Sequence, residues 1–150
     1  MTRLAAHGIA ITVPRGWEGR IVRRPTSHPA EQSGAVVHVA SFPMPESRGD
    51  FGVGVTELMR SGDIFLTLFE YGPESVGKPL FAASGVPHLT ENLFSSKRLQ
   101  RTLPGQVGSQ RFFTASHRAF CLYVVVAGRL NLARLLPPTN TMLGALELTR

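Results

Sequence analysis

The stretch from Gln110 to Gly128, QRFFTASHRAFCLYVVVAG, decides the fold of this chain. Two apolar runs flank the short polar turn Ala115–Arg118, a pattern that predicts a β-hairpin. Every position of the returning run, Ala119–Ala127, is apolar. Because successive residues of a strand point to opposite sides, such a strand must be covered on both faces. The hairpin therefore predicts a central strand of a packed globular protein.

Other segments add strands to this centre. Asp63–Tyr71 is also apolar on both faces, so we expect it near the middle of the same sheet. Shorter runs with alternating or continuous apolar residues are bounded by prolines and glycines, as strands commonly are. These remaining strand candidates are Ile9–Val13, Gly19–Arg24, Ala35–Phe42 and, at a sheet edge, Leu146–Thr149, with a loop expected over Thr26–Gly34.

Two short helices are expected beside the strands. The apolar spacing within Gly54–Arg60 is that of a two-turn helix. Pro137 and Pro138 are expected to start a second helix, since proline is tolerated in a first turn, and this helix would turn Met142 and Leu143 inward. The chain as a whole predicts an α+β fold in a single domain over residues 1–150. Its sheet is largely antiparallel, with about six strands and one or two helices packed on it.

Between residues 72 and 108 no periodicity holds, and prolines and glycines recur. A structureless run of this length is unusual inside a compact domain. Its apolar residues favour a segment that wraps the sheet as a cover, and binding surfaces often lie on such loops. The expected anchors are Leu80, Phe81, Leu89, Leu93, Phe94, Leu99 and Leu103.

Composition bounds the class of protein. Of 150 residues, 43% are apolar and 17% are charged, which indicates a folded chain. The single Cys121 cannot form an internal disulfide, and its apolar strand favours a buried thiol. No stretch reaches the roughly 18 apolar residues that a membrane helix needs, and the first residues lack the apolar run of a secretion signal. We therefore expect a cytoplasmic protein without a membrane span, unless a signal preceded Met1.

Charge is unevenly distributed along the chain. The net charge is +6, and it divides into +3 over residues 1–31, −4 over residues 32–91 and +7 over residues 92–150. An acidic middle between basic ends suits a charged partner or self-association. Solvated surface charge without a partner explains the same pattern equally well.

The sequence contains no pattern that usually carries catalysis, a metal or a cofactor. Its five histidines have no metal-ligand spacing to one another or to the cysteine. A nucleophile elbow of the G-x-S-x-G type is absent. Gly72–Lys78 fits the start of a phosphate-binding loop, but Pro79 stands where a Ser or Thr should bind magnesium. We predict no catalytic, cofactor-binding or metal-binding residue, which argues against an enzyme.

Basic residues are the main candidates for binding. Arg20 and Arg24 can share one face of a strand, and Lys97, Arg98 and Arg101 have helical spacing. If the two groups meet in space, they would attract phosphates or an acidic protein surface. No recognition helix, RNA-recognition or zinc-finger motif accompanies them, so a nucleic-acid partner is not indicated by a motif.

Trp17 completes the list of binding candidates. It lies in a turn between two expected strands, where it can cap the end of the sheet or anchor a partner, and capping is the favoured interpretation. The surrounding run Ile9–Ile21, IAITVPRGWEGRI, resembles the opening of the PsbP-like fold, which a Ran-binding import factor shares. The arginine-rich style resembles that of small actinobacterial proteins. The resemblance implies a non-catalytic scaffold for binding or assembly, and it supplies no functional residue.

Three hypotheses for function remain open. The first is a non-catalytic binding or assembly module that engages a protein partner, or a second copy of itself, through loops and basic patches. The second is a domain that binds an anionic ligand such as a nucleic acid or a phospholipid. The third is a small enzyme with an unrecognised site.

Overall fold

The computed structural model describes residues 1–24 and 34–150. Within these residues the fold is α+β, with eight strands in two antiparallel sheets and one α-helix. The predicted fold class is confirmed, although the strands form two sheets instead of one. The loop predicted at 26–34 lies outside the described residues, except for Gly34.

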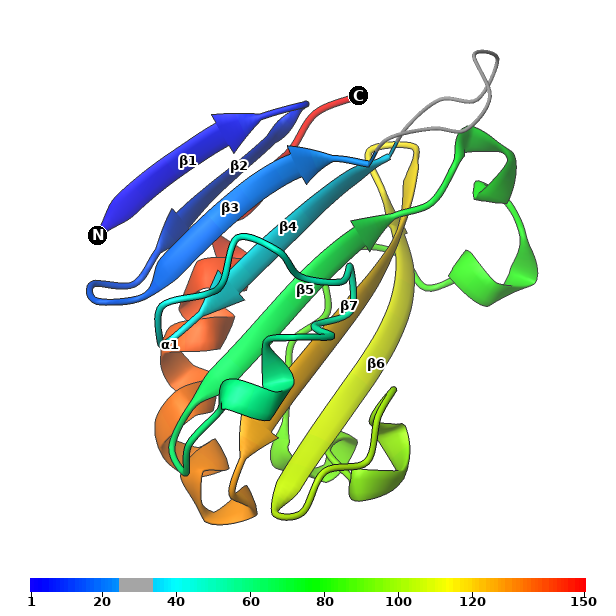
Figure 1. Cartoon of the computed structure of the whole chain (residues 1–150). Helices are drawn as coiled ribbons and strands as arrows, with labels where there is room; N and C mark the ends of the chain where they lie inside the picture. The colour runs from blue at the N-terminus through cyan, green and yellow to red at the C-terminus, as the bar shows by residue number, and fades with distance from the viewer. Residues whose placement is uncertain (25–33) are drawn as a thin grey trace.

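The larger sheet has five antiparallel strands in the order β3-β4-β5-β7-β6 (Figure 1). Strands β5 and β7 each have a hydrogen-bonded neighbour on both sides, so both predicted interior strands are confirmed. Strands β3 and β6 are the two edges. The bounds are β3 (Glu18–Arg23), β4 (Ala35–Ala40), β5 (Ile64–Glu70), β6 (Gln106–Ala115) and β7 (Arg118–Ala127).

The smaller sheet has the order β1-β2-β8 and lies beside β3. It consists of β1 (Thr2–Ala6), β2 (Ile9–Val13) and β8 (Glu147–Leu148), and β8 is the edge strand that the sequence predicts. Strand β1 was not among the sequence expectations, because its side chains are mostly exposed and show no apolar face. Its backbone hydrogen bonds to β2 make it a strand, although its sequence has no strand pattern.

The two faces of the larger sheet have different covers. The inner face packs against the smaller sheet and the helix α1 (Leu132–Gly144), which lies behind the sheet in Figure 1. The outer face is crossed by residues 41–63, the connection between β4 and β5. Phe65 and Tyr123 on this face are almost fully buried. The sheet is thus a layer between two covers, as the all-apolar strands require.

Helix α1 begins earlier than expected. It starts at Leu132 and contains Pro137 and Pro138, so the expectation that the prolines open the helix is wrong. Interior proline removes a backbone donor and usually breaks a helix. Here Pro137 lies on the exposed side, where water can reach the carbonyl groups that lose their partner. Met142 and Leu143 are buried, as predicted.

The expected helix at 54–60 is a single 3₁₀ turn, η1 (Thr56–Leu58). Its side chains do not form the inward stripe that the spacing suggested, because Leu58 is 55% exposed while Thr56 is buried. A segment this short does not form a stable α-helix without tertiary contacts.

The segment from 72 to 108 contains four 3₁₀ turns, η2 (Pro73–Ser75), η3 (Pro79–Phe81), η4 (Glu91–Leu93) and η5 (Ser96–Arg98). Phe81, Leu89 and Phe94 are its buried anchors, whereas Leu80 is 59% exposed and does not anchor the segment. Across residues 1–24 and 34–150, no helix combines the length and the apolar character needed to cross a bilayer.

Candidate functional site

Five segments that are distant in the sequence meet at one end of the molecule. They are the β1–β2 turn, the end of β3, residues 70–76 at the end of β5, the β6–β7 turn and the C-terminal residues, all at the top of Figure 1. A pocket of about 750 Å³ lies among them, and we call it the hairpin-tip pocket. Its lining residues are His7, Gly8, Arg23, Glu70, Tyr71, Pro73, Val76, His117, Arg118, Ala119 and Arg150.

Each of the two turns presents a histidine to this pocket. The central residues of the β1–β2 turn, His7 and Gly8, have φ of 53° and 75°. Those of the β6–β7 turn, Ser116 and His117, have φ of 51° and 60°. Positive φ at both central positions defines the type I′ turn, which matches the twist of a hairpin. Three of the four are not glycine, and such strained positions often occur at functional sites.

Arg118 holds the floor of the pocket together. Its guanidinium donates two hydrogen bonds to the Glu70 carboxylate, at 2.7 and 2.8 Å. Three more go to backbone carbonyl oxygens of His7, Gly8 and Thr149, at 2.9–3.1 Å. All five N–H donors of the side chain are therefore used. Since Arg118 is only 12% exposed, it acts as a structural tie between both sheets and the C-terminal segment.

The Glu70 carboxylate is committed to this tie. Burial by itself raises the pKa of Glu70, but the hydrogen bonds from Arg118 and from the Ala35 backbone N–H outweigh it. The pKa of Glu70 therefore lies below its ordinary value, and Arg23 lowers it further through its charge. Glu70 is ionised at neutral pH, and Arg118 neutralises its charge.

Further contacts fix the turns relative to one another. The Thr149 backbone N–H donates to the Gly8 carbonyl at 2.9 Å, and the Ser116 hydroxyl donates to the Leu148 carbonyl at 2.7 Å. Gly8 is required here, because a Cβ at this position would lie 2.7 Å from Arg118 Nη1. The pocket is thus formed by segments that are already held in place.

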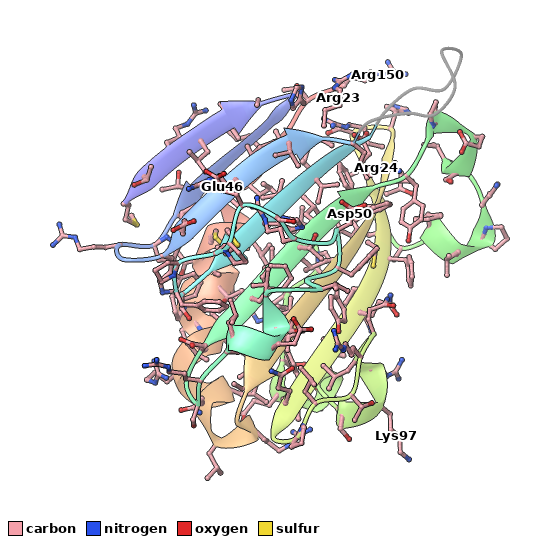
Figure 2. The ribbon with its side chains drawn as sticks, viewed as in Figure 1. Arg23, Arg24, Glu46, Asp50, Lys97 and Arg150 are labelled. Atoms are coloured by element: carbon pink, nitrogen blue, oxygen red, sulfur yellow. The ribbon has the colours of Figure 1, made fainter. Side chains whose placement is uncertain are left out.

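The guanidinium groups of Arg23 and Arg150 give the pocket its positive charge. Within residues 1–24 and 34–150, the side chains of His7, Arg23, His117 and Arg150 form no ion pair. Figure 2 shows Arg23 and Arg150 near each other at this end of the molecule. With the Glu70 charge neutralised, the described lining is cationic. Such an arrangement can hold an anion through charge-assisted hydrogen bonds.

The opposite wall of the pocket is less polar. It consists of Tyr71, Pro73 and Val76. The Tyr71 ring packs against the rings of Phe69 and Phe81, with centroids 4.9 and 5.0 Å away. Burial raises the pKa of Tyr71, so its hydroxyl stays protonated at neutral pH. The pocket therefore offers charge on one side and an aromatic and aliphatic surface on the other.

The predicted basic residues do not meet in one patch. Arg20 and Arg24 belong to the β3 edge, whereas Lys97 and Arg98 lie beside β6 at the other edge. Four strand spacings, about 19 Å, separate these edges. Figure 2 shows Arg24 and Lys97 at different ends of the molecule. Arg101 pairs with Glu57 of η1.

Besides Arg101, three more of these binding candidates have intramolecular partners. The Arg20 side chain pairs with Glu18 at 3.2 Å. The Arg24 guanidinium lies 4.4 Å from the centre of the Phe69 ring and donates to the Glu70 carbonyl. Trp17 is half-buried and packs against the main core. These contacts favour structural roles for Arg20, Arg24 and Trp17.

The residues that do converge were not chosen from the sequence. His7 and His117 each belong to a two-residue turn. Arg23 is the last residue of β3, and Arg150 is the last residue of the sequence. A histidine in a tight turn between two strands is a local signal that can be read in advance. That two such turns meet depends on the arrangement of the sheets, for which the sequence carries no local signal.

Other chemistry finds little support among the described residues. They contain no cluster of three or more His, Cys, Asp or Glu side chains placed to hold a metal ion. Burial raises the pKa of the Cys121 thiol to about 11, so it is a poor nucleophile. Comparison of the chain with protein-family models, curated proteins and solved structures finds no match.

Proposed function

We propose that this protein is a non-catalytic binding module whose hairpin-tip pocket holds an anionic, phosphate-bearing ligand. The observation that carries the proposal is the convergence of His7, Arg23, His117 and Arg150 on one pocket whose acid, Glu70, is neutralised by Arg118. Of the hypotheses from the sequence, anion binding fits this arrangement best, because arginine forks match phosphate oxygens bidentately.

The size and the two walls of the pocket narrow the ligand class. A volume of about 750 Å³ lies within the range of roughly 300–1,000 Å³ for small-molecule sites. The cationic wall would take one or more phosphates, and the Tyr71 wall would take an organic group such as a base or an acyl chain. A phosphorylated small molecule therefore fits better than a bare ion.

Calorimetric titration of the full chain with ATP and with inorganic pyrophosphate tests the proposal. We expect binding that weakens as salt increases, and weaker binding by pyrophosphate, which lacks the organic part. Replacing Arg23 and Arg150 by Ala together is expected to weaken ATP binding about tenfold or more, because each charged hydrogen bond contributes about 1.5–3 kcal/mol. His117→Asn adds to the loss while keeping the turn, since Asn tolerates positive φ.

Arg15→Ala is the matched control. Arg15 is an exposed arginine in the β2–β3 turn, and this turn and the β1–β2 turn lie at opposite ends of β2. The substitution therefore removes the same charge at a distance from the hairpin-tip pocket. Equal loss of ATP binding in Arg15→Ala and Arg23→Ala would attribute binding to net charge and contradict a specific site. No binding of either probe at low salt would contradict the proposal outright.

Protein assembly remains the competing proposal. The expected protein partner or homo-oligomer would engage loops and basic patches without needing a filled pocket. Sedimentation of the full chain over a range of concentrations and salt decides between them. A stable oligomer that binds neither ATP nor pyrophosphate would favour assembly, whereas a monomer that binds ATP favours the ligand-binding module.

A further inference from the structure

A second, smaller pocket lies at the other edge of the larger sheet, beside β6. Residues 92–98 run along this edge strand and pair with it through Ser95 and Gly108, which exchange hydrogen bonds of 2.9 and 3.0 Å. Next to this bridge is a cavity of about 230 Å³, which we call the edge pocket. It shares no lining residue with the hairpin-tip pocket.

Strand register places two β6 residues together on the inner face of the sheet. Ser109 lies opposite Val124, and Arg111 lies opposite Leu122, whose side chains belong to the main core. Both Ser109 and Arg111 line the edge pocket. Residues two apart on a strand share a face, so a buried hydroxyl and a guanidinium border the same space.

The Ser109 hydroxyl is the most informative atom of this pocket. Ser109 is 1% exposed, and its Oγ has no hydrogen-bond partner within residues 1–24 and 34–150. Buried hydroxyl groups nearly always have a partner, because an unsatisfied one costs folding free energy. A ligand in the pocket would supply the missing acceptor.

The wall opposite β6 is held in place. The Ser95 hydroxyl accepts a hydrogen bond from the Lys97 backbone N–H at 3.0 Å and so caps the 3₁₀ turn η5. Gly108 allows the close approach of this wall, since a Cβ there would lie 2.7 Å from Leu99 Cδ2. Lys97 and Arg98 therefore extend from a fixed turn, and Figure 2 shows Lys97 at this end of the molecule.

Three cations border this small space without a partner of opposite charge. Lys97, Arg98 and Arg111 line the pocket, and in the described part of the chain none of them forms an ion pair. No acidic residue stands among the lining residues that the structure describes. Like charges held close together repel, so a bound anion would stabilise this arrangement.

We propose that the edge pocket binds a single phosphate-like oxyanion. The Ser109 hydroxyl donates to one oxygen, and Lys97, Arg98 and Arg111 balance the negative charge. A volume of about 230 Å³ suits one tetrahedral group and is small for a nucleoside. The group is either free inorganic phosphate or the phosphoryl end of a phosphomonoester, and both present the same oxygens.

Ser109→Ala tests the proposal through two effects of opposite sign. Without ligand the variant is expected to be as stable as the wild type or more so, because an unsatisfied buried hydroxyl is removed. The rise in Tm that inorganic phosphate produces is expected to shrink, with binding about tenfold weaker. Chloride at equal ionic strength separates site binding from screening.

Charge variants and matched controls complete the experiment. Replacing Lys97 and Arg98 by Ala together is expected to remove most of the phosphate-dependent rise in Tm, leaving at most what the hairpin-tip pocket contributes, whereas Lys78→Ala, an exposed lysine outside the pocket, retains it. Arg23→Ala also retains it, so failure of this site is distinguishable from failure of the hairpin-tip pocket. Amide chemical shifts of Ser109 and Arg111 during phosphate titration locate the binding.

Two probes distinguish the sources of the phosphate group. If inorganic phosphate and glycerol 3-phosphate bind alike, the pocket recognises the phosphoryl group itself; if only the ester binds, the group is carried by a larger ligand. Either result supports the proposal when the probe that binds shifts the Ser109 and Arg111 amides. A rise in Tm that chloride reproduces, or that Ser109→Ala and the double variant leave unchanged, would overturn it and leave an adventitious ion only.

Discussion

Arg111 and Arg118 lie on the two strands of one hairpin, and the fold uses them in opposite ways. Arg118 is 12% exposed and donates all five of its hydrogen bonds to protein oxygens. Arg111 is exposed beside the edge pocket and forms no ion pair with any residue that the structure describes. Burial and satisfied donors therefore separate an arginine that maintains the fold from one that is available to a ligand.

Removing each arginine side chain in turn tests this difference most directly. Arg118→Ala is expected to lower the free energy of unfolding by about 3 kcal/mol, because the partly buried Glu70 carboxylate would lose its partner. Arg118→Lys is expected to recover part of the loss, since a lysine keeps the charge without the five-donor geometry. Urea denaturation followed by circular dichroism measures both.

Arg111→Ala is the control on the same hairpin. We expect a change within about 0.5 kcal/mol, as for exposed surface substitutions. Comparable destabilisation by Arg111→Ala and Arg118→Ala would show that burial and partners do not separate the two roles.

Gly8 and Gly16 test whether the Arg118 guanidinium is held rigidly against the β1–β2 turn. Both have positive φ, 75° and 83°, so alanine at either position carries the same backbone cost, about 1 kcal/mol. Only at Gly8 would the added Cβ meet Arg118 Nη1; nothing lies within 4 Å of it at Gly16. Gly8→Ala is expected to cost about 2 kcal/mol and Gly16→Ala about half as much, measured by urea denaturation. Equal costs would mean that the guanidinium shifts freely and does not fix the turn.

The central strands were predictable because their signal is local. An unbroken apolar run such as Ala119–Ala127 admits few other readings, and the fold class and the interior positions of β5 and β7 follow from it. Strand β1 and the start of α1 were not predictable in this way. Exposed strands such as β1 have no apolar face, and Pro137 normally signals a boundary instead of an interior position.

The candidate sites depended on arrangement more than on residue type. Lys97 and Arg98 were predicted binding residues and do line a pocket, but their companions there, Ser109 and Arg111, come from β6. Arg20 was predicted on the same grounds and pairs with Glu18 instead. Sequence shows where the charges are, whereas the order of the strands decides which of them meet.

A third arginine, Arg48, differs from both Arg111 and Arg118, because its hydrogen-bond partner His38 can titrate. Its Nε–H donates to His38 Nδ1 at 2.8 Å, and the other ring nitrogen, Nε2, lies 2.8 Å from the Asp50 carbonyl oxygen. A guanidinium has only donors, so Nδ1 must be the acceptor and Nε2 must carry the hydrogen. His38 is 2% exposed, and this geometry fixes the neutral ring in one tautomer. Protonation would remove the acceptor that Arg48 uses.

As the pH falls, the free energy of unfolding should therefore decrease first through His38 and only at lower pH through Glu70. Burial is the largest cause that lowers the pKa of His38, and the charge of Arg48 lowers it further, against the hydrogen bond to Asp50. In the unfolded chain His38 therefore binds a proton near pH 6.5, whereas in the folded chain it does so only at lower pH. Stability consequently decreases as pH falls below 6.5. Glu70, whose pKa lies below 4.5, contributes only at lower pH.

His38→Gln tests this smallest effect, because glutamine can still donate to the Asp50 carbonyl but does not titrate. The loss of unfolding free energy between pH 6.5 and 4.5 is expected to flatten in this variant, as measured by urea denaturation at each pH. An unchanged slope would place the acid sensitivity at other histidines and would make the Arg48–His38 contact an ordinary structural hydrogen bond, like those of Arg118. A flattened slope would instead place Arg48 in a class of its own: an arginine that is satisfied only while its partner stays neutral.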